Sequence, residues 1–130
     1  MGNESPYKGK TGFRRLFAAV GYSMDGLVSA WTLEAAFRQL CVVAAIGVGI
    51  ALYLPLQGWP RALIVLTHLI GLIVELINSA IEAAVDHTSL AHHPLAKRAK
   101  DLGSAAQFLS LMALLLIWWF ALVDIFGAMK

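Results

Sequence analysis

Residues 105–123 read AAQFLSLMALLLIWWFALV, a stretch in which Gln107 and Ser110 are the only polar side chains. A helix that crosses a membrane needs about 20 predominantly apolar residues, so this stretch suffices by itself. Two other apolar stretches, at 40–54 and 62–77, reach that length only with their polar flanks. The pattern predicts an all-α membrane protein with three spanning helices, at 34–54, 61–85 and 99–123.

The composition agrees with a single integral-membrane domain that occupies residues 1–130. The chain has 130 residues, of which 59% are hydrophobic and only 14% charged. Soluble domains are about half apolar and about a quarter charged, which argues against a soluble globular enzyme and a disordered chain. The net charge of +2 is too small for a nucleic-acid-binding protein. The one cysteine, Cys41, excludes an intrachain disulfide and a multi-cysteine metal site.

Before the first span, apolar residues recur at the spacing of one helix face. This pattern, with lysines beside it, predicts an amphipathic helix at residues 11–29 that lies on the membrane surface. The alternative is a helix buried in a soluble core, although the sequence offers no soluble domain for it to pack against. The stripe consists of Phe13, Leu16, Phe17, Val20, Met24 and Leu27.

Positive charges are divided unevenly between the connecting segments, and this division predicts the orientation. The segment before the surface helix and its first turn carry four Lys or Arg residues, and the connection before the third span carries three. The first connection has only Arg61, and the C-terminal tail has only Lys130. Because cytoplasmic loops are enriched in Lys and Arg, we expect a multi-pass protein with a cytoplasmic N-terminus.

The second span carries polar side chains at helical spacing. At about 100° per residue, Glu75, Glu82 and Asp86 form one stripe, and Asn78 lies beside it. Ionisable residues inside a membrane are costly and usually functional, so this stripe predicts a reaction site near the cytoplasmic boundary. The alternative is a structural hydrogen-bond network between helices, in which Asn78 and small residues hold the helices together.

Further charged residues are expected at the same level of the membrane. Glu34 precedes the first span, and Asp101 follows a basic run at the start of the third. Carboxylates of this kind can hold Mg²⁺ together with phosphate oxygens, and lysine or arginine can hold the phosphates. A deeper carboxylate could accept a proton from a hydroxyl, which completes the parts needed for phosphoryl transfer. The sequence has no GxxxxGK[ST] motif, so any nucleotide site is of another kind.

Several of these segments also carry a family resemblance. ELINSAIEAAVD at 75–86, EAAFRQ at 34–39, AKDLGSA at 99–105, TGFRR at 11–15 and GYS at 21–23 resemble the prokaryotic diacylglycerol kinases. The resemblance covers nearly the whole chain in order. It implies a homotrimeric kinase of the bacterial inner membrane that uses ATP and Mg²⁺ to phosphorylate 1,2-diacylglycerol. The product would be phosphatidic acid, which returns diacylglycerol to phospholipid synthesis.

The resemblance also implies roles for individual residues. Glu75 would be the catalytic base on the lipid hydroxyl, and Glu34 and Glu82 would bind the metal that carries ATP. Asn78 and Asp86 would support the site. The residues implied in ATP binding, besides Glu34 and Glu82, are Arg15, Tyr22, His93, Lys100 and Asp101. Those implied on the lipid side, besides Glu75, are Arg15, Gly21, Tyr22, Ser23, Ala30, Trp31, Arg38, Gln39 and Ser104.

The sequence departs from the family pattern at a few positions. Ala91 and His92 differ from the family's cytoplasmic loop, whereas His93 matches it. Asp25 stands where a basic residue is common. His68, inside the second span, is expected to be a hydrogen-bonded residue between helices rather than a proton relay.

Three other functions stay open at the level of sequence. The first is an undecaprenol kinase of the same architecture, against which the longer N-terminal helix and the run at 34–39 argue. The second is a small proton-coupled transporter that uses Glu75, a reading that leaves Lys100 and Asp101 unexplained. The third is a structural membrane subunit without activity. A kinase assay with each lipid separates the first of these from a diacylglycerol kinase.

Overall fold

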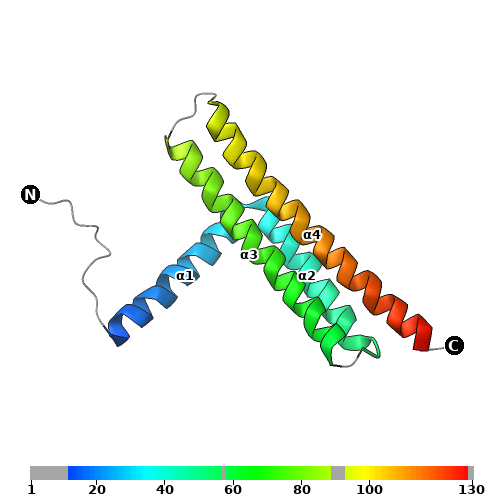
Figure 1. Cartoon of the computed structure of the whole chain (residues 1–130). Coiled ribbons are helices and arrows are strands. Elements are labelled where there is room, and N and C mark those ends of the chain that lie inside the picture. The colour runs from blue at the N-terminus through cyan, green and yellow to red at the C-terminus, as the bar shows by residue number, and fades with distance from the viewer. Residues whose placement is uncertain (1–11, 57, 89–92, 129–130) are drawn as a thin grey trace, which may run out of the picture.

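The described part of the chain is built from helices alone. The structure, a computed structural model, describes residues 12–56, 58–88 and 93–128. Within these ranges it consists of four helices and no strand: α1 (Phe13–Leu33), α2 (Ala35–Tyr53), α3 (Trp59–Thr88) and α4 (Pro94–Ala128) (Figure 1). This confirms the predicted all-α class. The last two helices begin earlier than the sequence suggested, because α3 includes Trp59 and α4 starts at Pro94.

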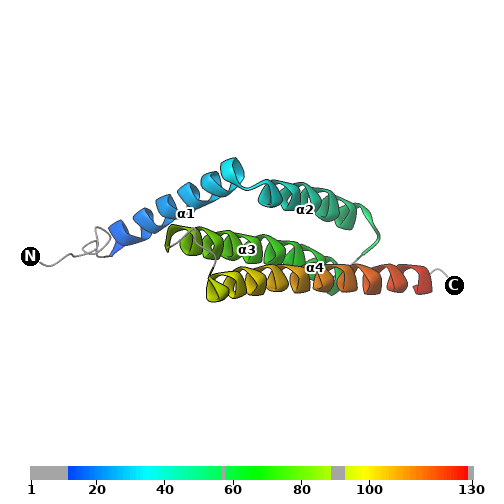
Figure 2. The same ribbon diagram turned by 90° about the horizontal axis from the view of Figure 1, so that it is seen from above.

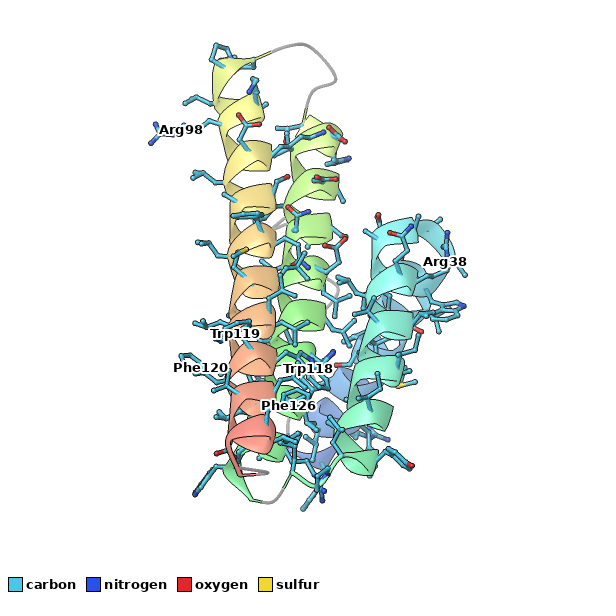
Figure 3. All side chains as sticks on the ribbon, turned by 90° about the vertical axis from the view of Figure 1, so that its right-hand side faces the viewer. Arg38, Arg98, Trp118, Trp119, Phe120 and Phe126 are labelled. Atoms are coloured by element: carbon cyan, nitrogen blue, oxygen red, sulfur yellow. The ribbon has the colours of Figure 1, made fainter. Side chains whose placement is uncertain are left out.

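Three of the helices are long and apolar enough to cross a membrane. They are α2 with 19 residues, α3 with 30 residues, and the segment Pro94–Gly127 of α4 with 34 residues. Large apolar side chains point outward along all of them, as lipid-facing helices require. Figure 3 shows this on α4, where Trp119 and Phe120 point outward while Trp118 faces the other helices. The chain is therefore a membrane protein with three spans.

The helix α3 is the centre of the bundle. It packs most extensively along α4 and to a lesser extent against α2. Figures 1 and 2 show α3 and α4 side by side, whereas α1 leaves the bundle at an angle from its junction with α2. The apolar stripe of α1 is exposed: Phe13 is 81% and Phe17 74% accessible. An exposed apolar face on a projecting helix fits the predicted position on a membrane surface.

A core cluster closes the end of the bundle at the α2–α3 connection. Leu56, Ala51 and Ile64 are almost fully buried there, together with Ala121 from α4. Arg61 joins the two helices, because its Nε donates to the Ala51 carbonyl and its Nη2 to the Leu54 carbonyl, both at 3.2 Å. The last carbonyl groups of a helix have no partners within it, so a cation at the end of α2 satisfies them and complements the helix dipole.

The helices α2 and α3 approach each other closely at Gly47. A Cβ atom on Gly47 would overlap the imidazole of His68 and would lie 2.6 Å from its Cε1. The imidazole is 5% exposed and meets the edge of Trp118 from α4, with the ring centres 6.5 Å apart. His68 thus joins three helices by packing. The expectation of a hydrogen bond between helices is not met, because its Nδ1 donates to the Ile64 carbonyl of its own helix at 2.8 Å.

Candidate active site

Three carboxylates come together around α3. Glu75, two turns before Glu82 on the same helix, is 5% exposed and lies deep in the bundle. Glu34 is the residue between α1 and α2, with extended backbone angles (φ −104°, ψ 111°). The charges of Glu34 and Glu82 both act on Glu75. The arrangement places one nearly buried carboxylate beside two partly exposed ones.

A cleft lies beside this cluster, between α1 and α3. Its volume is about 580 Å³, and most of its lining is apolar or small. Glu34 contributes a charged group to the cleft wall. The cleft therefore offers an apolar compartment with a carboxylate at its edge. Its other lining residues include Ser23, Leu27, Ala30, Leu76, Ser79 and Ala83.

The ends of α3 and α4 near residues 86 and 100 are joined by an ion pair. Lys100 Nζ lies 2.6 Å from Asp86 Oδ1, and the charge of Glu82 also acts on Lys100. Lys97 pairs with Asp101 at 2.5 Å within α4. Lys100 thus links the carboxylate stripe of α3 to α4, while Asp101 is engaged by a neighbour one turn away.

His93 has a local role in this structure. Its Nδ1 accepts a hydrogen bond from the Leu95 backbone N–H at 3.2 Å, and its carbonyl accepts one from the Lys97 N–H at 3.0 Å. These bonds satisfy backbone donors in the first turn of α4, as an N-cap residue does. The two neighbouring departures from the family pattern, Ala91 and His92, lie outside the described residues.

The remaining residues expected at the site divide between α1 and the surfaces of α2 and α4. Arg15 lies in the first turn of α1, which projects away from the bundle, so one chain alone places it apart from the carboxylates. Ala30 is buried at the other end of α1. The Ser23 hydroxyl donates to the Ala19 carbonyl at 2.9 Å. The exposed members of the set are Arg15, Gly21, Tyr22, Ser23, Trp31, Gln39 and Ser104.

Arg38 bonds to backbone rather than to a side chain. Its Nη1 donates to the carbonyls of Trp31 at 2.8 Å and Thr32 at 3.2 Å, which belong to the last turn of α1. Sequence reasoning missed this contact because it depends on a helix break at Glu34. A helix end ahead of an arginine is a signal that could have suggested it.

Asn78 contacts α4 beside the carboxylates. A Cβ atom on Gly103 would overlap Asn78 Oδ1 and would lie 3.3 Å from its Cγ. One turn further along α4 is Gln107. Among the described residues, Asn78 Oδ1 and both amide atoms of Gln107 are buried without a hydrogen-bond partner. Polar groups without partners are rare inside proteins, so the Asn78 and Gln107 side chains stand out among the described residues.

We expect Gly103→Ala to impair the activity of this site. The new methyl group has to displace the Asn78 side chain, and overpacking of this kind costs about 1 to 3 kcal/mol. A matched control is Gly127→Ala on the same helix, where a Cβ atom would meet nothing within 4 Å. Turnover and thermal unfolding in detergent would be measured for both variants. Unchanged turnover in Gly103→Ala would show that the Asn78 position is not critical.

The carboxylates of the described residues do not form a complete metal-binding site by themselves. Among the residues that the structure describes, no group of three or more His, Cys, Asp or Glu side chains is arranged to hold an ion. The two carboxylates expected as metal ligands, Glu34 and Glu82, would make a smaller donor set. Mg²⁺ is usually bound by one or two carboxylates plus substrate phosphates, so this donor set fits a metal that arrives with a nucleotide.

Comparison with known proteins identifies the family of this chain. The family model of prokaryotic diacylglycerol kinase matches residues 21–122. The diacylglycerol kinase of Pseudomonas aeruginosa is 49% identical over 114 residues, which are 88% of this chain and 93% of that protein. The Helicobacter pylori enzyme is 49% identical over 115 residues, 88% of this chain and 89% of its own length. The Escherichia coli K12 enzyme is 43% identical over 117 residues, 90% of this chain and 96% of its own length. The chain belongs to the prokaryotic diacylglycerol kinase family.

Proposed function

We propose that this protein transfers the γ-phosphoryl group of ATP to the free hydroxyl of 1,2-diacylglycerol and so forms phosphatidic acid. The observation that carries the proposal is Glu75, a nearly buried carboxylate in a membrane-spanning helix, on which the charges of Glu34 and Glu82 act. Relatives named diacylglycerol kinase over most of the chain support the lipid assignment. The reaction would return diacylglycerol to phospholipid synthesis.

Glu75 would act as the general base. A carboxylate within hydrogen-bond reach of the lipid hydroxyl can accept its proton as the oxygen attacks the γ-phosphorus. Phosphoryl transfer otherwise depends on positioning and on stabilisation of charge. Glu34 and Glu82 would hold the Mg²⁺ that accompanies ATP, and the ion would supply positive charge beside the phosphate oxygens. Lys100, with Asp86 beside it, would add a cation near the same end of α3.

The cleft between α1 and α3 would receive the lipid. It opens beside membrane-facing helices, and its mostly apolar lining suits acyl chains. Lipid would therefore enter laterally from the bilayer while ATP comes from the cytoplasm. Ser23 and Ala30 of α1 line this cleft. The other residues proposed for the lipid are Arg15, Gly21, Tyr22, Trp31, Gln39 and Ser104, and those proposed for ATP include Arg15, Tyr22, His93, Lys100 and Asp101. Arg38 was also expected on the lipid side, but its guanidinium bonds backbone carbonyls of α1, and we do not assign it a lipid contact.

A homotrimer would complete the site. Because α1 projects from the bundle, Arg15 and Tyr22 could approach the carboxylates of a neighbouring subunit rather than those of their own. The exposed apolar faces of the three spans leave room for such subunit contacts as well as for lipid. We also propose a location in the bacterial inner membrane, with the N-terminus and the α3–α4 connection cytoplasmic, in accord with the distribution of Lys and Arg.

A kinase assay tests the proposal. The purified protein in detergent micelles would receive radiolabelled ATP and either 1,2-diacylglycerol or undecaprenol, each with and without Mg²⁺. We expect label in phosphatidic acid, dependent on Mg²⁺, with little transfer to undecaprenol. Preferential labelling of undecaprenol would assign the other lipid. No label transfer to either lipid would overturn the kinase proposal.

A further inference from the structure

Arg38 joins α1 to α2 by hydrogen bonds that the proposed function does not use. This residue lies in the first turn of α2 and its guanidinium group reaches back across the helix break. It donates to the Trp31 carbonyl at 2.8 Å and to the Thr32 carbonyl at 3.2 Å. In an uninterrupted helix these carbonyls would accept bonds from backbone N–H groups four residues later. The break removes those donors, and Arg38 replaces them.

Glu34 is the single residue that separates α1 from α2 at this break. Its N–H donates to the Ala30 carbonyl at 2.9 Å and closes α1, while its own carbonyl accepts from the Arg38 N–H at 3.4 Å and opens α2. Its φ of −104° and ψ of 111° make it the extended residue between two helices. Arg38 is thus bonded on both sides of Glu34, through its side chain to α1 and through its backbone to α2. Figure 3 shows Arg38 at this end of α2.

The bonds of Arg38 also occupy the guanidinium group that could otherwise pair with Glu34. An acidic residue four positions before an arginine forms an ion pair on a continuous helix. In the described part of the chain the ion pairs are Lys97–Asp101 and Lys100–Asp86, and Arg38 bonds carbonyls instead. The break and the capping bonds therefore keep the guanidinium from neutralising Glu34. A carboxylate without a cationic side chain beside it can still bind a metal ion.

We propose that Arg38 is a positioning residue, which caps α1 and holds the helix break so that the Glu34 carboxylate faces Glu75 and Glu82. Glu34 lines the cleft, and its charge acts on Glu75. The inference rests on the proposed function, because it takes Glu34 as a ligand of the Mg²⁺ that accompanies ATP. It gives Arg38 a role distinct from direct contact with the lipid.

The test separates metal dependence from lipid dependence. Binding of Mn²⁺, a paramagnetic substitute for Mg²⁺, to Arg38→Met with a non-hydrolysable ATP analogue would be measured by electron paramagnetic resonance, and it should weaken relative to the parent protein. Kinase activity of the variant would be measured against Mg²⁺ at saturating diacylglycerol, and against diacylglycerol at saturating Mg²⁺. We expect the Mg²⁺ concentration for half-maximal activity to rise about tenfold, which corresponds to about 1.4 kcal/mol. The KM for diacylglycerol should stay near that of the parent protein. Arg38→Lys keeps a charged donor and should recover part of the metal affinity, and it replaces Arg38→Met if that variant does not fold.

Two comparison variants make the outcome decisive. Arg14→Met removes an exposed arginine from α1 and should leave the Mg²⁺ titration unchanged. Glu34→Gln should by itself raise the Mg²⁺ concentration for half-maximal activity. Adding Arg38→Met to that variant should then raise it no further. If Glu34→Gln leaves the titration unchanged, the proposed metal role is wrong. If Glu34→Gln shifts it but Arg38→Met does not, or raises only the KM for diacylglycerol, the positioning role is overturned.

Discussion

Replacement of Glu75 by glutamine should abolish nearly all turnover while the bundle stays folded. General base catalysis contributes about 10² to 10⁴ in rate, and an amide cannot take up the hydroxyl proton at neutral pH. The substitution keeps the size of the side chain, and it removes a charge from a position only 5% exposed and acted on by Glu34 and Glu82. Stability should therefore be unchanged or higher. Turnover with diacylglycerol and ATP, together with thermal unfolding in detergent, measures both expectations.

The matched control is Asp124→Asn, which makes the same change of charge near the other end of α4 on an exposed residue. Its turnover should match that of the parent protein. A Glu75→Gln variant that retains near-normal turnover would remove Glu75 as the base. A variant that unfolds would indicate that Glu75 is needed for the bundle, and Glu75→Asp would then be compared, because it keeps the carboxylate.

Helix identity and the carboxylate stripe were predictable because both depend on local spacing. Apolar length distinguishes a spanning helix, and the step of seven positions from Glu75 to Glu82 returns a helix to nearly the same face. The hydrogen bonds from Arg38 and Arg61 to backbone carbonyls were not predictable in the same way. To predict either bond, one has to know the residue at which the preceding helix ends. Such an end, like the break at Glu34, depends on tertiary packing as well as on the local sequence.

Contacts between helices were the other part that sequence could not supply. The spacing of Lys97 and Asp101 indicates their ion pair, whereas the contact of Lys100 with Asp86 depends on the register of α4 against α3. The same register places Asn78 against Gly103. Among the described residues, the side-chain amide of Gln107 is buried without a hydrogen-bond partner. The family resemblance named Asn78 as a supporting residue, but it gave no indication of Gln107.

The polar residues of α3 therefore fall into two groups, one at the candidate active site and one in the packing between helices. Glu75, Asn78 and Glu82 lie toward the end where Lys100 and Asp86 pair, and the burial of the Glu75 carboxylate there is costly unless it serves a reaction. His68 lies two turns further into the membrane from Glu75 and is held by packing and by its own helix. A change at His68 should alter stability more than the chemistry, and the contact with Gly47 provides a way to measure this.

We expect Gly47→Ala to destabilise the bundle strongly, although alanine is the better helix former by about 1 kcal/mol. The added Cβ would overlap the imidazole of His68, which cannot turn away without breaking its bond to the Ile64 carbonyl and its edge contact with Trp118. Overpacking in a well-packed core costs about 1 to 3 kcal/mol, so the propensity gain should be outweighed. Unfolding by heat or denaturant in detergent gives the free-energy change.

The control lies two residues away on the same helix. A Cβ atom on Gly49 would meet nothing within 4 Å, so Gly49→Ala should be neutral or stabilising. A double-mutant cycle measures the coupling, and its second mutation is His68→Ala, which removes the ring and lowers stability by itself. In that background Gly47→Ala should cost little, and the coupling between the two sites should reach about 0.5 to 3 kcal/mol. Simple addition of the two single effects would mean that the α2–α3 contact is looser than the overlap implies, and that α2 can shift away from α3 without loss.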